Sequence, residues 1–154
     1  MYPSGAIFIA LFNTINNAFN TLAFTIAAAN PTYLSPYSMY VGAALYTTGI
    51  LVETHSEIQR KLFKDRPENK GRPYAGGLFS LARNINYGGY TLWRSGMALA
   101  AGGPVWGLLT FAFFTWDFST RAIPVLEEYC RKKYGEQYKR IEKEVPYRLF
   151  PGIY

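Results

Sequence analysis

The sequence predicts an all-α integral membrane protein, a helical bundle of about four transmembrane helices with an amphipathic helix on the cytosolic side. Two observations lead to this fold class. Residues 1–52 contain no Asp, Glu, Lys, Arg or His, and residues 86–118 carry only Arg94 and Asp117 as charges. A water-soluble helix needs charge on its outward face, so uncharged stretches of this length are typical of helices in lipid.

Composition sets the broad class. A chain of 154 residues forms one domain, which we take as a single membrane domain over residues 1–154. Aromatic residues make up 18% of the chain, and Tyr and Trp favour the membrane–water boundary. The net charge of +6 does not indicate nucleic-acid binding, because the basic residues stand beside long uncharged segments rather than on a soluble fold.

The first two predicted spans cover residues 5–29 and 37–52. The first is apolar, but it carries Asn13, Asn16, Asn17 and Asn20, whose spacing places at least three amides on one helical face. Lipid cannot satisfy these amides, so we expect them to face other helices.

A polar block, residues 53–84, separates these spans from two more. The third span is predicted over residues 85–101 and the fourth over 105–118, joined by a tight turn at Gly102-Gly103-Pro104. Residues 119–154 form a second polar block, in which residues 125–143 have helical periodicity and predict an amphipathic helix at the membrane surface.

Charge predicts the orientation. Residues 54–85 hold seven Lys and Arg against three acidic residues, and residues 119–154 hold eight against five. Two spans separate these blocks, so both lie on one side of the bilayer, and an excess of Lys and Arg marks the cytosolic side. We therefore expect the N- and C-termini to be cytosolic.

No nucleophile motif, metal-ligand cluster or phosphate-binding loop occurs, so the catalytic residues are unknown and no metal is expected. A group of cations stands at the cytosolic boundary: Arg60, Lys61, Lys64, Arg72 and Arg83. Cations at a helix end can hold phosphate groups. The general excess of Lys and Arg on the cytosolic side of membrane proteins would by itself place these residues here. On composition alone, this explanation is favoured over a phosphate site.

Arg94 and Asp117 are the charges inside the third and fourth spans. Counted from the turn, they differ in depth by roughly 7 Å at 1.5 Å per residue. Two alternatives stay open: the two side chains form a buried ion pair, or Arg94 faces a polar cofactor channel.

Three segments carry a resemblance to a known superfamily. Residues 80–93, Ser-Leu-Ala-Arg-Asn-Ile-Asn-Tyr-Gly-Gly-Tyr-Thr-Leu-Trp, resemble the signature Arg-His-x-Asn-Tyr-x-Gly-(Asp/Glu) of the steroid 5-alpha-reductases and sterol reductases, a superfamily that includes isoprenylcysteine carboxyl methyltransferases. Residues 127–154 are similar to the end of the delta-7 and delta-14 sterol reductases. Residues 57–64 are similar to their Gln-Lys-x-x-Phe-Arg segment.

The resemblance implies an NADPH pocket built by the C-terminal spans and cytosolic loops. Carried over residue by residue, the resemblance implies that Arg60 and Lys64 hold the cofactor phosphates. It implies that Arg83, Asn86 and Tyr87 form the signature turn and that Glu127 and Tyr134 lie on the cofactor-facing helix. Arg94, as a possible channel residue, completes the candidate cofactor-binding set. Asn84 replaces the His of the signature and Tyr90 its acidic residue, so two hydrogen-bonding groups are absent.

Three functions follow as expectations. The first is a membrane reductase that uses NADPH to saturate a C=C bond of a steroid-like or other lipophilic substrate, at the endoplasmic reticulum. The second is a methyltransferase that uses S-adenosylmethionine on a lipid or an isoprenylcysteine-type substrate. The third is a non-catalytic sterol-binding or accessory membrane protein. In each case the expected partners are a lipophilic small molecule and the bilayer. The sequence is also compatible with a second subunit, which would be a copy of this chain or another membrane protein.

Overall fold

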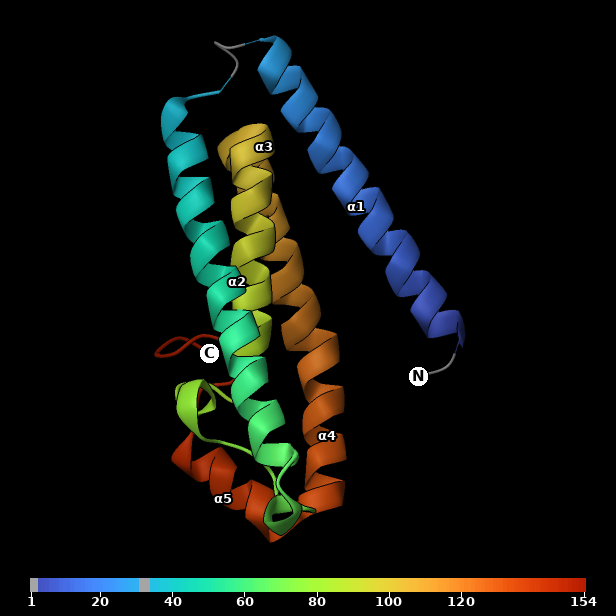
Figure 1. Ribbon diagram of the computed structural model, residues 1–154, viewed down its shortest axis with the longest axis vertical. Coiled ribbons are helices and arrows are strands. Elements are labelled where there is room, and N and C mark those ends of the chain that lie inside the picture. Colours follow the sequence, from blue (N-terminus) through green and yellow to red (C-terminus); the bar gives the residue numbers. More distant parts are fainter. Residues whose placement is uncertain (1–2, 31–33) are drawn as a thin grey trace.

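The computed structural model describes residues 3–30 and 34–154, and within them the chain is helical with no strand (Figure 1). The helices are α1 (Pro3–Ala29), α2 (Pro36–Lys64), α3 (Ile85–Asp117), α4 (Ile123–Tyr134) and α5 (Glu136–Glu144). Shorter helical turns are η1 (Pro67–Asn69), η2 (Gly77–Ser80) and the π-helical η3 (Phe118–Ala122). The predicted all-α class is confirmed.

Helix α3 reverses direction at Gly103, so its two limbs run antiparallel (Figure 1). Gly103 has a φ of 80°, which side chains with a Cβ rarely adopt, and Pro104 follows it at the start of the second limb. The limbs touch along their length. At the end far from the turn, the rings of Tyr87 and Phe118 stack with centroids 4.6 Å apart. The reversal lies where the sequence places the Gly102–Pro104 turn.

One helical stretch among the described residues, Ile85–Tyr134, is long and apolar enough to cross a membrane by length and composition alone. The predicted count of four spans is therefore not confirmed. Helix α2 also differs from the predicted span 37–52, because it does not end at Val52 but continues through the charged residues to Lys64.

Four glycines bring α2 and the first limb of α3 into backbone contact. A Cβ built on Gly42 would lie 2.6 Å from the carbonyl oxygen of Gly96, and one on Gly49 would lie 2.6 Å from that of Gly89. The reverse contacts are equally close. Small residues at such positions allow helices in membranes to pack by direct van der Waals contact. This pairing is the structural centre of the bundle.

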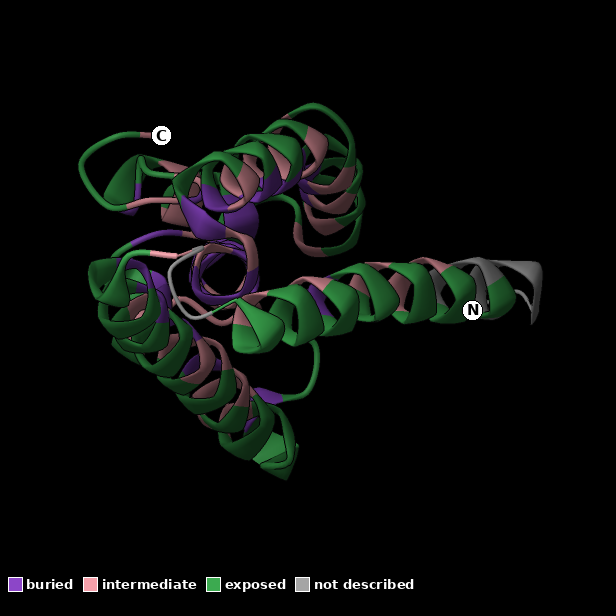
Figure 2. Cartoon of the chain, turned by 90° about the horizontal axis from the view of Figure 1, so that it is seen from above, coloured by how far each residue is buried: buried purple, intermediate pink, exposed green. Residues whose placement is uncertain are grey.

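Helix α1 leans away from the bundle (Figure 1), and most of its described residues are exposed (Figure 2). Asn20, by contrast, is only 1% exposed, and its side-chain oxygen accepts a hydrogen bond from the Trp106 indole at 2.9 Å. A helix with amides inward and aliphatic side chains outward is suited to lipid. The exposed apolar residues of α1 include Ile7, Leu11, Ile15, Phe19, Leu22 and Ile26.

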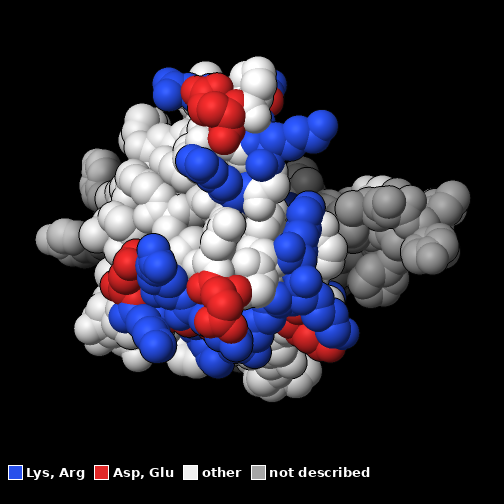
Figure 3. All heavy atoms as spheres, turned by 90° about the horizontal axis from the view of Figure 1, so that it is seen from below, with Lys and Arg blue, Asp and Glu red and all other residues white. Residues whose placement is uncertain are grey.

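The C-terminal region differs from the prediction of one amphipathic helix over residues 125–143. Two helices occur there, α4 and α5, because Gly135 interrupts the helix with a φ of 54°. Helix α4 is a continuation of the second limb of α3 through the π-helical turn η3. Basic and acidic side chains crowd the end of the molecule formed by α5 and the loops near η1 (Figure 3).

We expect Gly96→Leu to break the contact between α2 and α3, because a Cβ at Gly96 would lie 2.5 Å from the backbone nitrogen of Tyr46. Overpacking of this kind should lower the free energy of unfolding by about 3 kcal/mol, measured by denaturant titration in detergent. Ala43→Leu is the control, since Ala43 is exposed on α2, the helix that Gly96 contacts. Equal effects of the two substitutions would contradict the proposed contact.

Candidate functional site

A cavity of about 750 Å³ opens between α1, α2, the end of α3, η3 and α4. Its volume lies in the range of small-molecule and cofactor sites. Five charged side chains line it: Glu53, Glu57, Arg60, Asp117 and Arg121. Its neutral wall is aromatic and amide-bearing: Phe12, Asn13, Asn86, Tyr87, Tyr90, Phe113, Phe114 and Phe118.

Two of the three carboxylates in the cavity are neutralised locally. Arg60 pairs with Glu57 one turn away, and the Arg121 guanidinium donates to both oxygens of Asp117 at 2.6 and 2.7 Å. Glu57 also accepts a hydrogen bond from the Asn86 amide at 2.8 Å. The side chains that line the cavity therefore carry an excess of one negative charge. Arg94 acts on Glu53 from outside this lining, and Lys61 and Lys64 line an adjoining groove that also includes Glu53.

Glu53 is the carboxylate that carries this excess. Its side chain accepts a hydrogen bond from the Trp93 indole, and it makes no ion pair within residues 3–30 and 34–154. Glu53 lies just beyond the predicted span 37–52, and partial burial raises its pKa because the carboxylate loses solvation. A neighbouring positive charge would stabilise its ionised form.

An apolar crevice of about 350 Å³ adjoins the cavity between α1 and the second limb of α3. It shares Phe12, Phe113 and Phe114 with the cavity, so the same three rings border both the polar and the apolar space. The remaining lining is mainly aliphatic and aromatic: Ile15, Asn16, Phe19, Trp106, Leu109 and Thr110. A ligand with a polar end and a lipophilic body fits this combination.

Arg94 neither pairs with Asp117 nor lines the cavity among the described residues. It is 5% exposed and contacts α1, where Asn17 accepts a hydrogen bond at 2.8 Å and Asn13 and Asn16 also accept. The Tyr90 hydroxyl accepts a further bond at 2.9 Å. Arg94 therefore attaches α1 to α3 through neutral oxygens, and Asp117 takes Arg121 instead.

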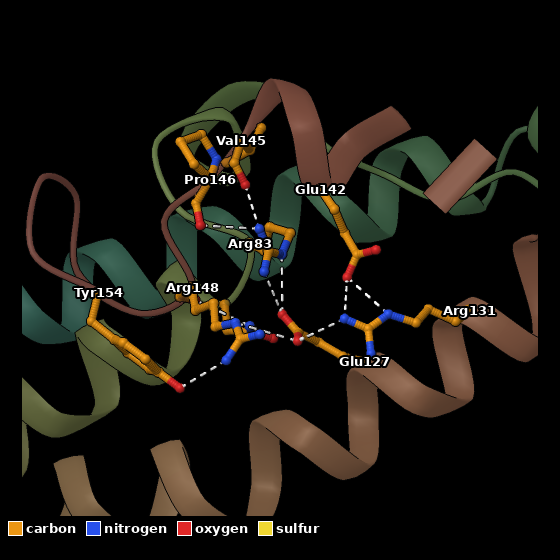
Figure 4. Close-up of polar contacts among 9 residues, drawn as sticks. Arg83, Glu127, Arg131, Glu142, Val145, Pro146, Arg148 and Tyr154 are labelled. Carbon is orange, nitrogen blue, oxygen red and sulfur yellow. Dashed lines mark hydrogen bonds and ion pairs between the residues drawn. The ribbon is translucent and has the colours of Figure 1, made fainter. Parts of the chain in front are cut away.

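The signature arginine, Arg83, is engaged in a buried cluster at the C-terminal segment (Figure 4). It forms an ion pair with Glu127 at 2.7 Å and donates to the carbonyl oxygens of Val145 and Pro146. Glu127 is 2% exposed and also lies 3.5 Å from Arg148 and 3.6 Å from Arg131. Figure 4 shows the three arginines converging on this one carboxylate.

The eight predicted cofactor-binding residues thus divide among separate places. Arg60, Asn86 and Tyr87 line the cavity. Lys64 donates to the Tyr134 hydroxyl at 3.1 Å and to a backbone carbonyl oxygen, beyond the cavity. Arg83 and Glu127 bind each other, and Arg94 binds α1, as described above.

Sequence reasoning did not assign the other four charged residues of the cavity to the site: Glu53, Glu57, Asp117 and Arg121. A signal was present for two of them. Glu53 and Glu57 are four residues apart, so they share one helical face at the point where the uncharged segment ends. That placement directs both carboxylates toward the same neighbouring helix.

Comparison with protein families gives one match over most of the chain. The family described as "Protein of unknown function (DUF1295)" matches residues 4–145. The chain belongs to this family. The DUF1295 family is part of the superfamily of steroid 5-alpha-reductases and isoprenylcysteine methyltransferases, so the resemblance stated from the motifs is confirmed.

Three curated proteins are similar to this DUF1295 chain. "Probable O-methyltransferase ustE" of Ustilaginoidea virens is 46% identical over 84% of this chain and 48% of its own length. "Protein-S-isoprenylcysteine O-methyltransferase B" of Arabidopsis thaliana is 27% identical over 69% of this chain and 52% of its own length. "Probable 7-dehydrocholesterol reductase" of Acanthamoeba polyphaga mimivirus is 33% identical over 51% and 17%. The chain spans about half the length of the two methyltransferases.

We expect Glu127→Gln to destabilise the DUF1295 chain by about 3 kcal/mol or more, because it leaves three arginines without their shared buried carboxylate. The free energy of unfolding in detergent measures the effect. Glu128→Gln is the neighbouring control: Glu128 is 65% exposed and pairs with Lys132 in solvent, so its replacement should leave the stability close to that of the wild type. A similar loss in both variants would show that the cluster is not stabilising.

Tyr138 predicts an alkaline limit to stability. Burial raises the pKa of Tyr138 from its ordinary 10 to about 12, because the phenolate would lose solvation. The folded state therefore holds the proton more tightly, and this contribution to stability, complete below pH 10, is lost as the pH rises to about 12. Tyr138→Phe should weaken the alkaline unfolding followed by circular dichroism. Tyr129→Phe, at an exposed position, should leave it unchanged.

Proposed function

We propose that the chain is part of a membrane-bound O-methyltransferase that uses S-adenosylmethionine to methylate an oxygen of a lipophilic acceptor. The excess negative charge of the cavity, located on Glu53, carries this proposal. S-adenosylmethionine has a sulfonium and an ammonium group against one carboxylate and is a net cation. NADPH carries several phosphate charges, which a cavity with excess carboxylate would repel.

The residues of the cavity fit such a cofactor. Glu53 offers an unpaired carboxylate for a positive charge, and the stacked rings of Tyr87 and Phe118 offer an aromatic surface of the kind that nucleobases pack against. When bound, S-adenosylmethionine supplies an electrophilic methyl carbon to an oxygen nucleophile, and the acceptor loses a proton if it enters as a hydroxyl. The chain contributes binding, orientation and exclusion of water.

The apolar crevice supports a lipophilic acceptor. Several of its lining side chains are exposed, including Ile15, Phe19 and Leu109. An acceptor lying there would reach the polar cavity past Phe12 and Phe113, which line both spaces. The similarity to two proteins named as O-methyltransferases supports the same reaction class.

An NADPH-dependent reductase of a C=C bond is the second candidate. A groove of about 740 Å³ shares Glu53, Glu57 and Arg60 with the cavity and adds Lys61 and Lys64. Its three cations could hold phosphate groups, and the 33% identity to a protein named as a sterol reductase agrees with this candidate. Against this candidate, the signature Arg83 is already saturated by Glu127 and two carbonyl oxygens.

We also propose that the membrane is that of the endoplasmic reticulum and that both termini are cytosolic. The charged end of the molecule would then lie in the cytosol (Figure 3), in accordance with the distribution of Lys and Arg along the chain.

Thermal stabilisation of the detergent-purified chain separates the two candidates. We expect S-adenosylmethionine to raise the melting temperature, because a ligand present at 100 times its Kd stabilises the folded state by about 2.7 kcal/mol, whereas NADPH should have no effect. When membranes containing the chain are incubated with methyl-labelled S-adenosylmethionine, the label should also appear in material that extracts into organic solvent. Stabilisation by NADPH alone would reject the methyltransferase and favour the reductase.

A further inference from the structure

Glu53 stands apart from the other carboxylates of the cavity. Glu57 is held by Arg60 and Asn86, and Asp117 by both donors of Arg121. Within the described residues, the Trp93 indole hydrogen bonds to one oxygen of Glu53, and the second oxygen accepts no hydrogen bond. An incompletely solvated carboxylate with a free oxygen at a cavity wall is an acceptor for a cation.

Glu53 has charged neighbours but no ion pair among the described residues. The charged groups that act on it or share its cavity are Glu57, Arg60, Arg94, Asp117 and Arg121, and Lys61 and Lys64 line an adjoining groove that Glu53 also borders. Arg60 and Arg121 pair with their own carboxylates, and Arg94 donates its hydrogen bonds to α1 and Tyr90 while its charge acts on Glu53 from behind Trp93. The guanidinium carbon of Arg94 lies 4.3 Å from the centre of the Trp93 ring, whose indole hydrogen bonds to Glu53. The carboxylate is therefore held in place without a direct ion pair.

We infer that Glu53 recognises the positive charge of the sulfonium group, and that through this contact the site distinguishes S-adenosylmethionine from S-adenosylhomocysteine. This inference rests on the proposed function. The two molecules differ by a methyl group and one positive charge, because methyl transfer turns the sulfonium into a neutral thioether. A carboxylate in a partly dry cavity favours the charged form and gains little from the neutral one. The spent cofactor thus loses its main electrostatic contact when the methyl group leaves.

The contact also predicts a direction for pH dependence. A bound cation stabilises the ionised carboxylate, so binding and deprotonation of Glu53 favour each other. Because burial raises the pKa of free Glu53, the affinity for S-adenosylmethionine should fall on acidification at a higher pH than for a fully solvated glutamate. The affinity for S-adenosylhomocysteine should change less over the same range.

Calorimetric titration of the full chain in detergent tests the inference with three probes: S-adenosylmethionine, S-adenosylhomocysteine and sinefungin, which has an ammonium group near the position of the sulfonium. The measured quantity is the ratio of the S-adenosylmethionine and S-adenosylhomocysteine affinities within each variant. We expect Glu53→Gln to reduce the preference for the cation by about tenfold, and sinefungin to follow S-adenosylmethionine. Glu53→Asp, which keeps the charge, should retain part of the preference.

Glu68→Gln is the matched control, because Glu68 is an exposed carboxylate of η1 outside the cavity, and its ratio should equal that of the wild type. A loss of folded protein lowers both affinities and leaves the ratio unchanged, so the ratio reports the contact itself. The inference is wrong, while the methyltransferase proposal stands, if Glu53→Gln keeps the wild-type ratio of S-adenosylmethionine to S-adenosylhomocysteine affinity. The same holds if the wild type binds these two probes equally. If the wild type binds none of the probes, both are wrong.

Discussion

The backbone contact between α2 and the first limb of α3 determines where the chemistry of this molecule can lie. Gly42 and Gly49 on α2 meet Gly96 and Gly89 on α3 with no room for a Cβ, so the two helices can slide neither along nor around each other without a clash. That register continues past the glycines. It sets Glu53 beside the Trp93 indole and, one turn further along α2, Glu57 beside the Asn86 amide. The charged wall of the cavity is thus a consequence of helix packing.

Two groups of charges in this chain serve different ends. Around Glu127, three arginines and the backbone carbonyl oxygens of the C-terminal segment enclose a single carboxylate, so the charges satisfy one another and order the chain near α4 and α5. Around Glu53 the compensation is incomplete, because the neighbouring arginines have partners of their own. The first arrangement is expected of a structural cluster, and the second of a surface that meets a ligand.

Local patterns in the sequence predicted the helices and the turn, and the motifs predicted the superfamily. The turn was readable because Gly-Gly-Pro between two apolar segments has few other conformations. Asp117 shows where this approach fails: depth along the helices suggested Arg94 as its partner, but Arg121 lies one helical turn away and can pair without bringing two helices into register. The Glu127–Arg131 pair has helical i,i+4 spacing, but Arg83 and Arg148 join the cluster from distant parts of the chain, which no spacing rule could reveal.

The second limb of α3, the π-helical turn η3 and α4 form one uninterrupted helical rod from Pro104 to Tyr134, on the order of 45 Å long. One end of the rod borders the apolar crevice, and the other carries Glu127 and its arginines. The crevice and the cluster that orders the C-terminal segment therefore lie on one continuous helix. A bend of this rod, and with it any change in how the crevice and the cluster lie relative to each other, is expected at the π-helical turn between them.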